Sequence, residues 1–190
     1  MKHLVLVGLM LIAVWLLAAQ VSNNITLVNK ILPAYGYACD LKLRGNIALI
    51  SGTEHALISY DVGNPANPVF LDSYYLDWAG YEDPFSSYGN LLVYGNYVYY
   101  YLNAETVEVF DVSDSGSISH LITLNSFADL ANRYVLQGNL LYATTAANLI
   151  TIWDLLNPLE PVQVGSYSLS NFALDLAVNG NYAYVRHYGG

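Results

Sequence analysis

The residues best suited to binding chemistry lie in one long connection between two β-rich stretches. This connection runs from Tyr75 to Tyr94 and is seven or eight residues longer than its counterparts elsewhere in the chain. Aromatic rings beside carboxylates are typical of sites that hold sugars, cationic groups or peptides, and such sites are commonly built on loops. The candidate contact residues are Asp77, Trp78, Tyr81, Glu82, Asp83 and Phe85. Alternatively, Trp78 and Phe85 fold back over the edge of a sheet and serve packing alone.

Patterns typical of catalysis are not evident elsewhere in the sequence. His55, His120 and His187 stand singly and lack the close spacing of a metal-binding pair. The serines have no G-x-S-x-G context, and glycine patterns for phosphate or dinucleotide binding do not occur. We therefore predict no catalytic residues, no metal and no cofactor, which favours a protein that is not an enzyme.

A repeated sequence pattern predicts the strands on either side of the long connection from Tyr75 to Tyr94. A Gly-Asn pair recurs at Gly45, Gly95, Gly138 and Gly180, at intervals of 50, 43 and 42 residues. An aspartate stands sixteen residues after each of the first three glycines, at Asp61, Asp111 and Asp154. Each aspartate ends a β-rich run just before a turn, where a carboxylate can accept backbone N–H groups. We predict that these aspartates are structural turn caps and not metal ligands.

Each repeat of about 42 residues predicts four short strands joined by tight turns. The expected strands include 38–43, 47–51, 56–60 and 69–74 in the first repeat and 140–143 and 149–153 in the third. The second and third strands are almost continuously apolar, so both faces of their sheet need cover. Sheets stacked face to face around an axis provide that cover, and this is the geometry of an all-β fold, the β-propeller. Outside the N-terminal segment, no stretch has helical periodicity.

Composition narrows the class of partner. The chain has 190 residues, a net charge of -9 and a pI near 4.5, which argues against nucleic acid because phosphates require a basic face. Charged residues make up 11%, and 18 tyrosines supply much of the hydrogen-bonding capacity instead. The single Cys39 cannot form an internal disulfide. Its place in the repeat, taken by Leu174 in the last copy, predicts a buried or half-buried side chain.

The N-terminus predicts an export signal that forms a helix. Lys2 and His3 precede an apolar run from Leu4 to Leu17, and small residues allow cleavage after Ala19. The run is shorter than the ~20 residues that span a bilayer comfortably. We expect a cleaved signal peptide, the alternative being an uncleaved anchor, which would then be the protein's contact with a membrane. The expected location is extracytoplasmic: secreted, periplasmic or at the cell surface.

Taken together, the motifs resemble those of the LVIVD-repeat family of exported bacterial and archaeal proteins. The resemblance rests on the runs ALISYD and LITIWD, the Asn-Pro turns that follow them, and GNYAYV at 180–185, and it covers 37–190. It implies a β-propeller outside the cytoplasm that usually serves as an interaction module, without a catalytic motif. The second repeat departs from the pattern, because DVSDSG replaces the proline turn.

The expected domains are a signal peptide at 1–19, an N-terminal segment at 20–36 and propeller repeats at 37–190, with units starting near 45, 95, 138 and 180. A fourth aspartate would fall beyond Gly190, so we expect an incomplete ring that is the N-terminal part of a longer protein. A small four-bladed closure and an oligomer that shares the ring are the alternatives. An open blade edge would permit self-association.

The sequence thus predicts a noncatalytic module that binds protein or carbohydrate at the cell surface. The alternative is an exported hydrolase, lyase or redox enzyme. Its active groups would lie on the rim of the propeller channel or in a C-terminal part beyond this sequence.

Overall fold

All regular secondary structure in the described part of the chain is β-strand. The structure, a computed structural model, describes residues 27–30, 38–52, 56–76, 89–103, 106–112, 115–125, 127, 133–145 and 147–188. These ranges contain no helix, and therefore none long and apolar enough to cross a membrane. The predicted signal segment 1–19 and its helix lie outside the described residues.

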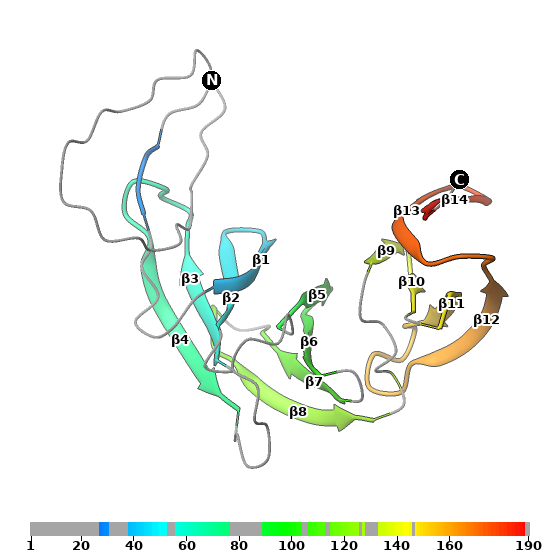
Figure 1. The fold of residues 1–190 in the computed structure, drawn as a ribbon. Coiled ribbons are helices and arrows are strands. Elements are labelled where there is room, and N and C mark those ends of the chain that lie inside the picture. Colours follow the sequence, from blue (N-terminus) through cyan, green and yellow to red (C-terminus); the bar gives the residue numbers. More distant parts are fainter. Residues whose placement is uncertain are drawn as a thin grey trace. The chain divides into compact units, whose positions relative to one another are not determined.

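The first sheet contains four antiparallel strands in the order β1-β2-β3-β4 (Figure 1). Its strands are β1 (Ala38–Arg44), β2 (Ile47–Gly52), β3 (Ala56–Asp61) and β4 (Val69–Tyr75). The four strands predicted from the pattern of apolar residues are confirmed, and each extends one residue beyond its predicted end.

Two further four-stranded sheets and a two-stranded sheet follow within the described residues. The second sheet contains β5 (Leu91–Tyr94), β6 (Tyr97–Asn103), β7 (Thr106–Asp111) and β8 (Ser119–Leu124), and the third contains β9 (Arg133–Gln137), β10 (Leu140–Thr144), β11 (Leu149–Asp154) and β12 (Val162–Ser168). The last sheet is the hairpin of β13 (Ala173–Asn179) and β14 (Tyr182–His187). Strands therefore pair with their neighbours in sequence throughout.

The described residues form two compact units. One extends to Tyr100 and includes Asp111–Ser119, and the other contains Tyr101–Phe110 and the residues from His120 onward. The first sheet belongs wholly to the first unit, whereas the third sheet and the last hairpin belong to the second.

The Gly-Asn pairs form the tight turns between the first and second strands of each sheet. Their glycines have φ between +57° and +63°, a left-handed conformation that glycine adopts without a Cβ penalty. The asparagine carbonyl then accepts an N–H from the residue after the recurring aspartate, as in Val62 to Asn46 at 2.7 Å and Leu155 to Asn139 at 2.8 Å. This hydrogen bond joins the turn before the second strand to the end of the third strand. It therefore fixes the sixteen residues between the glycine of each Gly-Asn pair and the aspartate.

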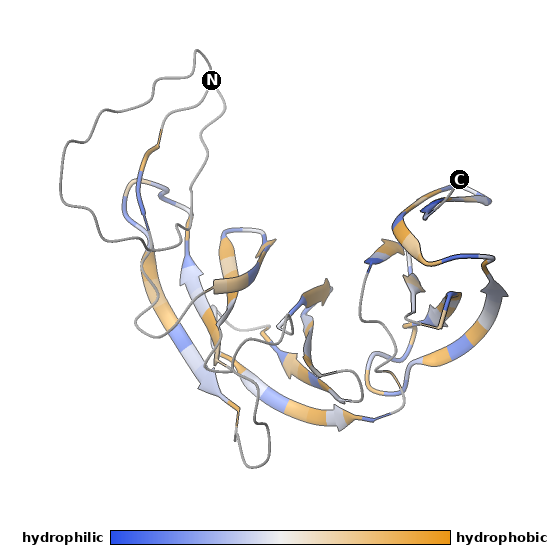
Figure 2. Ribbon diagram, viewed as in Figure 1, coloured by the Kyte–Doolittle hydropathy of each residue, from blue (hydrophilic) through white to orange (hydrophobic). Residues whose placement is uncertain are grey.

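The core is concentrated on the second and third strands of the sheets. In β2 and β3 four or more consecutive residues are buried, and β7 has four more between its ends. Because successive side chains point to opposite faces, consecutive burial means that both faces of the strand are covered. The fourth strands are more exposed, and Figure 2 shows hydrophobic and hydrophilic residues alternating at the start of β12.

Candidate functional site

The six loop residues predicted to contact a ligand are not placed by the structure. Asp77, Trp78, Tyr81, Glu82, Asp83 and Phe85 all lie outside the described residues. The candidate site must therefore be built from residues that sequence analysis did not select.

The recurring aspartates lie at strand ends beside turns. Asp61 accepts the N–H of Gly63 at 2.7 Å. Asp154 accepts the N–H of Leu156 at 2.8 Å and the side-chain amide of Asn139 at 2.6 Å. Asp111 is the last residue of β7. Among the described residues, no three His, Cys, Asp or Glu side chains gather closely enough to hold a metal ion.

A pair of side chains on the first sheet binds the backbone that leads into the second. Asp40 on β1 and Ser51 on β2 are cross-strand neighbours. The Asp40 carboxylate accepts the N–H of Leu91 at 2.9 Å, and the Ser51 hydroxyl donates to the carbonyl of Gly89. The carboxylate thus binds one backbone N–H, and the hydroxyl binds one backbone C=O, of the same short segment. We call this arrangement a peptide clamp.

The same sheet contains a second peptide clamp on its other two strands. Ser59 on β3 and Asp72 on β4 are cross-strand neighbours. The Ser59 hydroxyl donates to the carbonyl of Gly116 at 2.5 Å, and Asp72 accepts the N–H of Ile118 at 2.8 Å. As in the first clamp, the bound groups belong to a glycine with positive φ and to the residue two positions later. The recurrence shows that this sheet face is suited to holding extended backbone.

The last hairpin has an acceptor and a donor side chain at the positions that form the first peptide clamp in the first sheet. Alignment of the Gly-Asn pairs matches Asp175 with Asp40 and Arg186 with Ser51. Asp175 and Arg186 are cross-strand neighbours, as Asp40 and Ser51 are. Asp175 also accepts the N–H of the following residue at 3.0 Å, and Asp40 makes the equivalent bond at 2.7 Å. A guanidinium therefore takes the place of the serine hydroxyl as donor.

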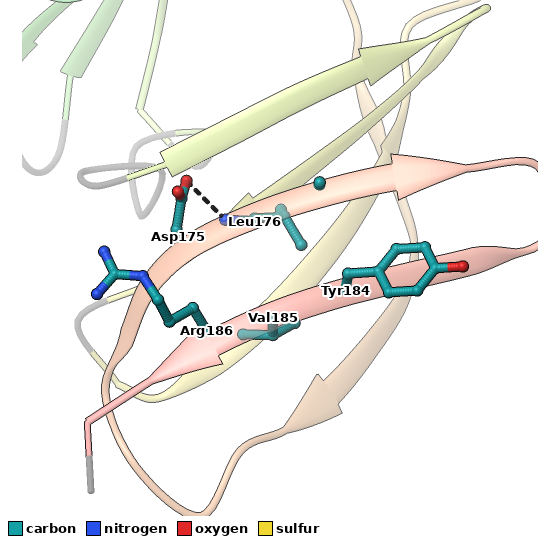
Figure 3. A pocket seen from close by; sticks show the side chains of 6 residues that line it. Asp175, Leu176, Tyr184, Val185 and Arg186 are labelled. Atoms are coloured by element: carbon teal, nitrogen blue, oxygen red, sulfur yellow. Dashed lines mark hydrogen bonds between the residues drawn. The ribbon is translucent and has the colours of Figure 1, made fainter. Parts of the chain in front are cut away.

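An open pocket of about 310 Å³ lies over this hairpin (Figure 3). It is lined by Asp175, Leu176, Ala177, Tyr184, Val185 and Arg186. Leu176 is buried, whereas Asp175, Tyr184 and Arg186 are exposed. Figure 3 shows Asp175 and Arg186 on neighbouring strands at one end of the pocket, with Tyr184 further along β14. The volume is at the lower end of the ~300–1,000 Å³ typical of ligand pockets.

The chemistry of this pocket suits a polypeptide backbone. The carboxylate supplies acceptors and the guanidinium supplies donors, and charge-assisted hydrogen bonds are stronger than neutral ones. Tyr184 adds an aromatic face with a hydroxyl group, while Leu176 and Val185 add apolar surface. An extended peptide presents alternating N–H and C=O groups beside apolar side chains, which matches these features.

The single cysteine lies close to the first peptide clamp. Cys39 is exposed, which corrects the expectation of a buried or half-buried side chain. Its side chain lies beside Gly89, where an added Cβ would be 3.0 Å from Cys39 Cβ and 3.4 Å from Cys39 Sγ. Neighbouring atoms nevertheless desolvate the sulfur and raise the pKa of the Cys39 thiol, and the Asp40 carboxylate raises it further. Because the thiolate is the nucleophile, a raised pKa weakens Cys39 as a reactive group near neutral pH.

One ionisable cluster was missed by sequence analysis. Glu108 on β7 is buried, and its carboxylate lies 2.6 Å from His120 Nε2 and accepts the Thr123 hydroxyl at 2.8 Å. The His120 ring also makes an edge contact with Phe110. A glutamate in the middle of the buried run TVEVFD was the available signal, because a buried charge requires a partner. His120 on β8 is therefore the partner of the buried Glu108 carboxylate.

Fold and contacts together define the class of protein. Successive four-stranded antiparallel sheets, with the first packed on the start of the second and the third packed on the last hairpin, form a β-propeller fold. The LVIVD repeat family matches residues 35–75 and 172–188, so these two segments are similar to LVIVD repeats. These matches coincide with the first sheet and with the hairpin that lines the pocket.

Solved structures show likeness in fold alone. The crystal structure of the computationally designed Ika4 protein has a TM-score of 0.59 and 15% identity, and the match covers 83% of this chain and 89% of Ika4. The computationally designed Ika8 protein has a TM-score of 0.51 and 17% identity, with 78% of this chain and 42% of Ika8 covered. Among curated proteins, none matches this sequence.

Proposed function

We propose that this chain is a noncatalytic β-propeller module that binds a polypeptide partner outside the cytoplasm through the pocket on β13 and β14. The observation that carries the proposal is the correspondence between this pocket and the first peptide clamp. Asp175 and Arg186 hold the positions of Asp40 and Ser51, which bind the backbone at Gly89 and Leu91.

One feature of the sequence supports the extracytoplasmic setting, and a second one narrows the class of partner. The first 19 residues have the short polar start, apolar run and small residues of an export signal. The net charge of -9 disfavours nucleic acid, whose phosphates need a basic surface.

The pocket favours protein over carbohydrate as the partner. A peptide clamp recognises one N–H and one C=O at fixed separation, and Asp175 with Arg186 offers the matching acceptor and donors. Carbohydrate remains the second partner class, since Tyr184 presents an aromatic face and the sequence places Trp78 in the long connection.

Peptide and glycan arrays probed with the purified protein test this function. We expect binding to peptides or proteins that weakens at least tenfold in Asp175→Ala and in Arg186→Ala, because each change removes one half of the clamp. Glu160→Gln serves as the control, since this exposed residue of the second unit lies outside the pocket. Binding to glycans that survives both pocket changes but is lost in Trp78→Ala would refute the proposed site and partner class. Turnover of a substrate by the purified protein would refute the noncatalytic function.

A further inference from the structure

The outer edge of the third sheet is a row of backbone groups on β12. The strand order is β12-β11-β10-β9, so within the described residues β12 pairs with β11 on one side only (Figure 1). Just beyond the end of β12, the Leu169 N–H binds the Asn148 carbonyl at 2.8 Å, a hydrogen-bonded pair directed inward. Such pairs alternate along an antiparallel ladder with pairs whose N–H and C=O groups point away. Ser166 and Ser168 therefore direct their backbone groups outward from the sheet.

Aspartates cap the backbone of three other strands that lie at the edges of their sheets. Each carboxylate accepts the N–H of the residue that follows it: Asp40 on β1 that of Leu41 at 2.7 Å, Asp72 on β4 that of Ser73 at 2.8 Å, and Asp175 on β13 that of Leu176 at 3.0 Å. A capped N–H is no longer available to a further strand, and a charge on an edge strand also discourages pairing.

The third sheet lacks this cap on its outer strand. Alignment of the Gly-Asn pairs matches Asp72 with Gly165 and Ser73 with Ser166. Because Gly165 has no side chain, the Ser166 N–H stays uncapped. The sequence of β12, VQVGSYS, also contains no charged residue and no proline, and the ladder is regular from Gly165 to Ser168, beyond the bulge near its start. Both serines are exposed. This edge is therefore suited to pairing with another strand.

We propose that β12 pairs in antiparallel fashion with β12 of a second copy of this chain, so that the two third sheets join edge to edge. Ser166 of each copy then exchanges backbone hydrogen bonds with Ser168 of the other, because these are the outward-facing residues. Tyr167 lies between them and faces its own counterpart across a two-fold axis. Aromatic pairs at such cross-strand positions stabilise a sheet.

A second copy is the occupant that the strand itself favours. The backbone donors and acceptors of Ser166 and Ser168 are identical in both copies, so a two-fold axis at Tyr167 satisfies all of them together. The chain carries a net charge of -9, and acidic groups on two copies repel wherever they meet. Between Glu160 and Asp175 the sequence contains no charged residue, so β12 brings no like charges into the contact.

Two variants remove the outward donor in different ways. Ser166→Pro deletes the N–H, and proline is tolerated on an edge strand where the N–H faces solvent. Gly165→Asp introduces the cap that Asp72 provides in the first sheet, and an added Cβ at Gly165 would lie 3.4 Å from Ile152 Cδ1, which leaves room for it. We expect the wild-type mass in sedimentation analysis to rise with concentration to a dimer and no further, because a two-fold contact closes on itself. Both variants should remain monomeric.

Matched controls separate the edge from the side chains. Ser166→Ala and Gly165→Ala leave the outward N–H uncapped, so both should form dimers like the wild type. Circular dichroism verifies that all four variants keep their strands. Arg186→Ala should also form dimers, because the pocket on β13 and β14 is separate from this edge. Failure of the proposed function and failure of this inference are therefore distinguishable.

A cysteine on the two-fold axis tests the register. In a Cys39→Ser background, Tyr167→Cys places two thiols in a pair without hydrogen bonds, whose Cα separation of ~4.5 Å permits a disulfide. We expect mild oxidation to give a covalent dimer that reductant dissolves, and less of it from Ser166→Cys, since Ser166 faces Ser168 of the second copy and not itself.

Three results would overturn the inference. They are a wild-type protein that stays monomeric at all concentrations, a dimer that survives both Ser166→Pro and Gly165→Asp, and a Tyr167→Cys protein that cross-links no better than Ser166→Cys. A monomer that instead binds extended peptides, and loses them in Ser166→Pro, would assign the edge to a different polypeptide and refute the second copy as its occupant.

Discussion

At the residue scale, Asp154 accepts a side-chain amide and a backbone N–H, whereas the hydrogen bond of Asp61 comes from the Gly63 backbone. We expect Asp154→Ala to lower the free energy of unfolding by about 1–3 kcal/mol, because it removes charge-assisted bonds at a turn. Asp61→Ala should cost less, and Asp154→Asn should recover part of the loss. Urea unfolding measures all three variants, and an Asp154→Ala midpoint equal to that of the wild type would contradict the capping role.

His120 and Glu108 provide a second prediction at this scale. Removing the imidazole in His120→Ala leaves the mostly buried Glu108 carboxylate with Thr123 as a remaining hydrogen-bond partner. We expect a loss of about 1–3 kcal/mol in the free energy of unfolding, because a buried charge that loses a partner is costly. A double-mutant cycle with Glu108→Ala should show coupling above about 0.5 kcal/mol. Additive effects would show that the two side chains act independently.

At the scale of strands and turns, the second peptide clamp depends on a glycine. Gly116 has φ of +94°, and a Cβ there would lie 2.2 Å from Leu71 Cδ1 and 2.9 Å from Leu71 Cβ. Gly95 also has positive φ, at +60°, but a Cβ there would meet no atom within 4 Å. Alanine substitutions at Gly95 and Gly116 therefore distinguish two costs. One is the strain of a left-handed backbone that carries a Cβ, and the other is the clash of that Cβ with Leu71.

We therefore expect Gly95→Ala to cost about 1–2 kcal/mol in the free energy of unfolding, from the left-handed backbone alone. Gly116→Ala should cost clearly more, because it also pushes the first sheet away from the segment that Ser59 and Asp72 bind. Thermal or urea unfolding of the two variants side by side measures the difference. Equal losses would mean that Leu71 moves aside freely.

The third sheet lacks an equivalent of this second clamp. Ile152 and Gly165 are cross-strand neighbours at the positions of Ser59 and Asp72. The Gly165 position leaves room for the Ile152 side chain, whose Cδ1 would lie 3.4 Å from an added Cβ. In the third sheet an apolar contact between Ile152 and Gly165 thus replaces the polar pair of Ser59 and Asp72. The strands of the repeat are the same in both sheets, but the side chains on their faces differ in polarity.

At the scale of the whole molecule, buried tyrosines predict how stability depends on pH. Tyr99 and Tyr100 on β6 are 0% and 1% exposed. Burial raises the pKa of both hydroxyls, with further contributions from Tyr94 and Tyr97 at Tyr99 and from Cys39 at Tyr100. In the unfolded chain tyrosine ionises near pH ~10. The folded state therefore keeps protons that the unfolded state loses above that pH.

The stability from this source is fully present below pH ~9 and falls as pH rises through ~10 toward the higher pKa of the folded state. Each tyrosine contributes a slope of at most about 1.4 kcal/mol per pH unit. Urea midpoints measured between pH ~8 and ~11 should decline at the alkaline end, and less steeply in Tyr99→Phe. A decline of the same steepness in that variant would assign the effect to other groups.

Strands, turns and repeat register followed from the sequence alone. Apolar runs, Gly-Asn turns such as Gly45 and strand-end aspartates such as Asp61 are local signals, because backbone conformation and side-chain alternation act over a few residues. The resemblance to LVIVD repeats rested on the same short motifs, and the family match confirmed it.

The peptide clamps and the pocket were decided by the tertiary structure. Asp40 and Leu91 are 51 positions apart, and Asp72 and Ile118 are 46 apart, so their pairing depends on how one sheet packs on the next. The pocket over Asp175 and Arg186 likewise depends on the pairing of β13 with β14, which makes these two residues cross-strand neighbours. Local patterns specify the strands, whereas long-range packing determines which polar groups meet a partner and which stay open to one.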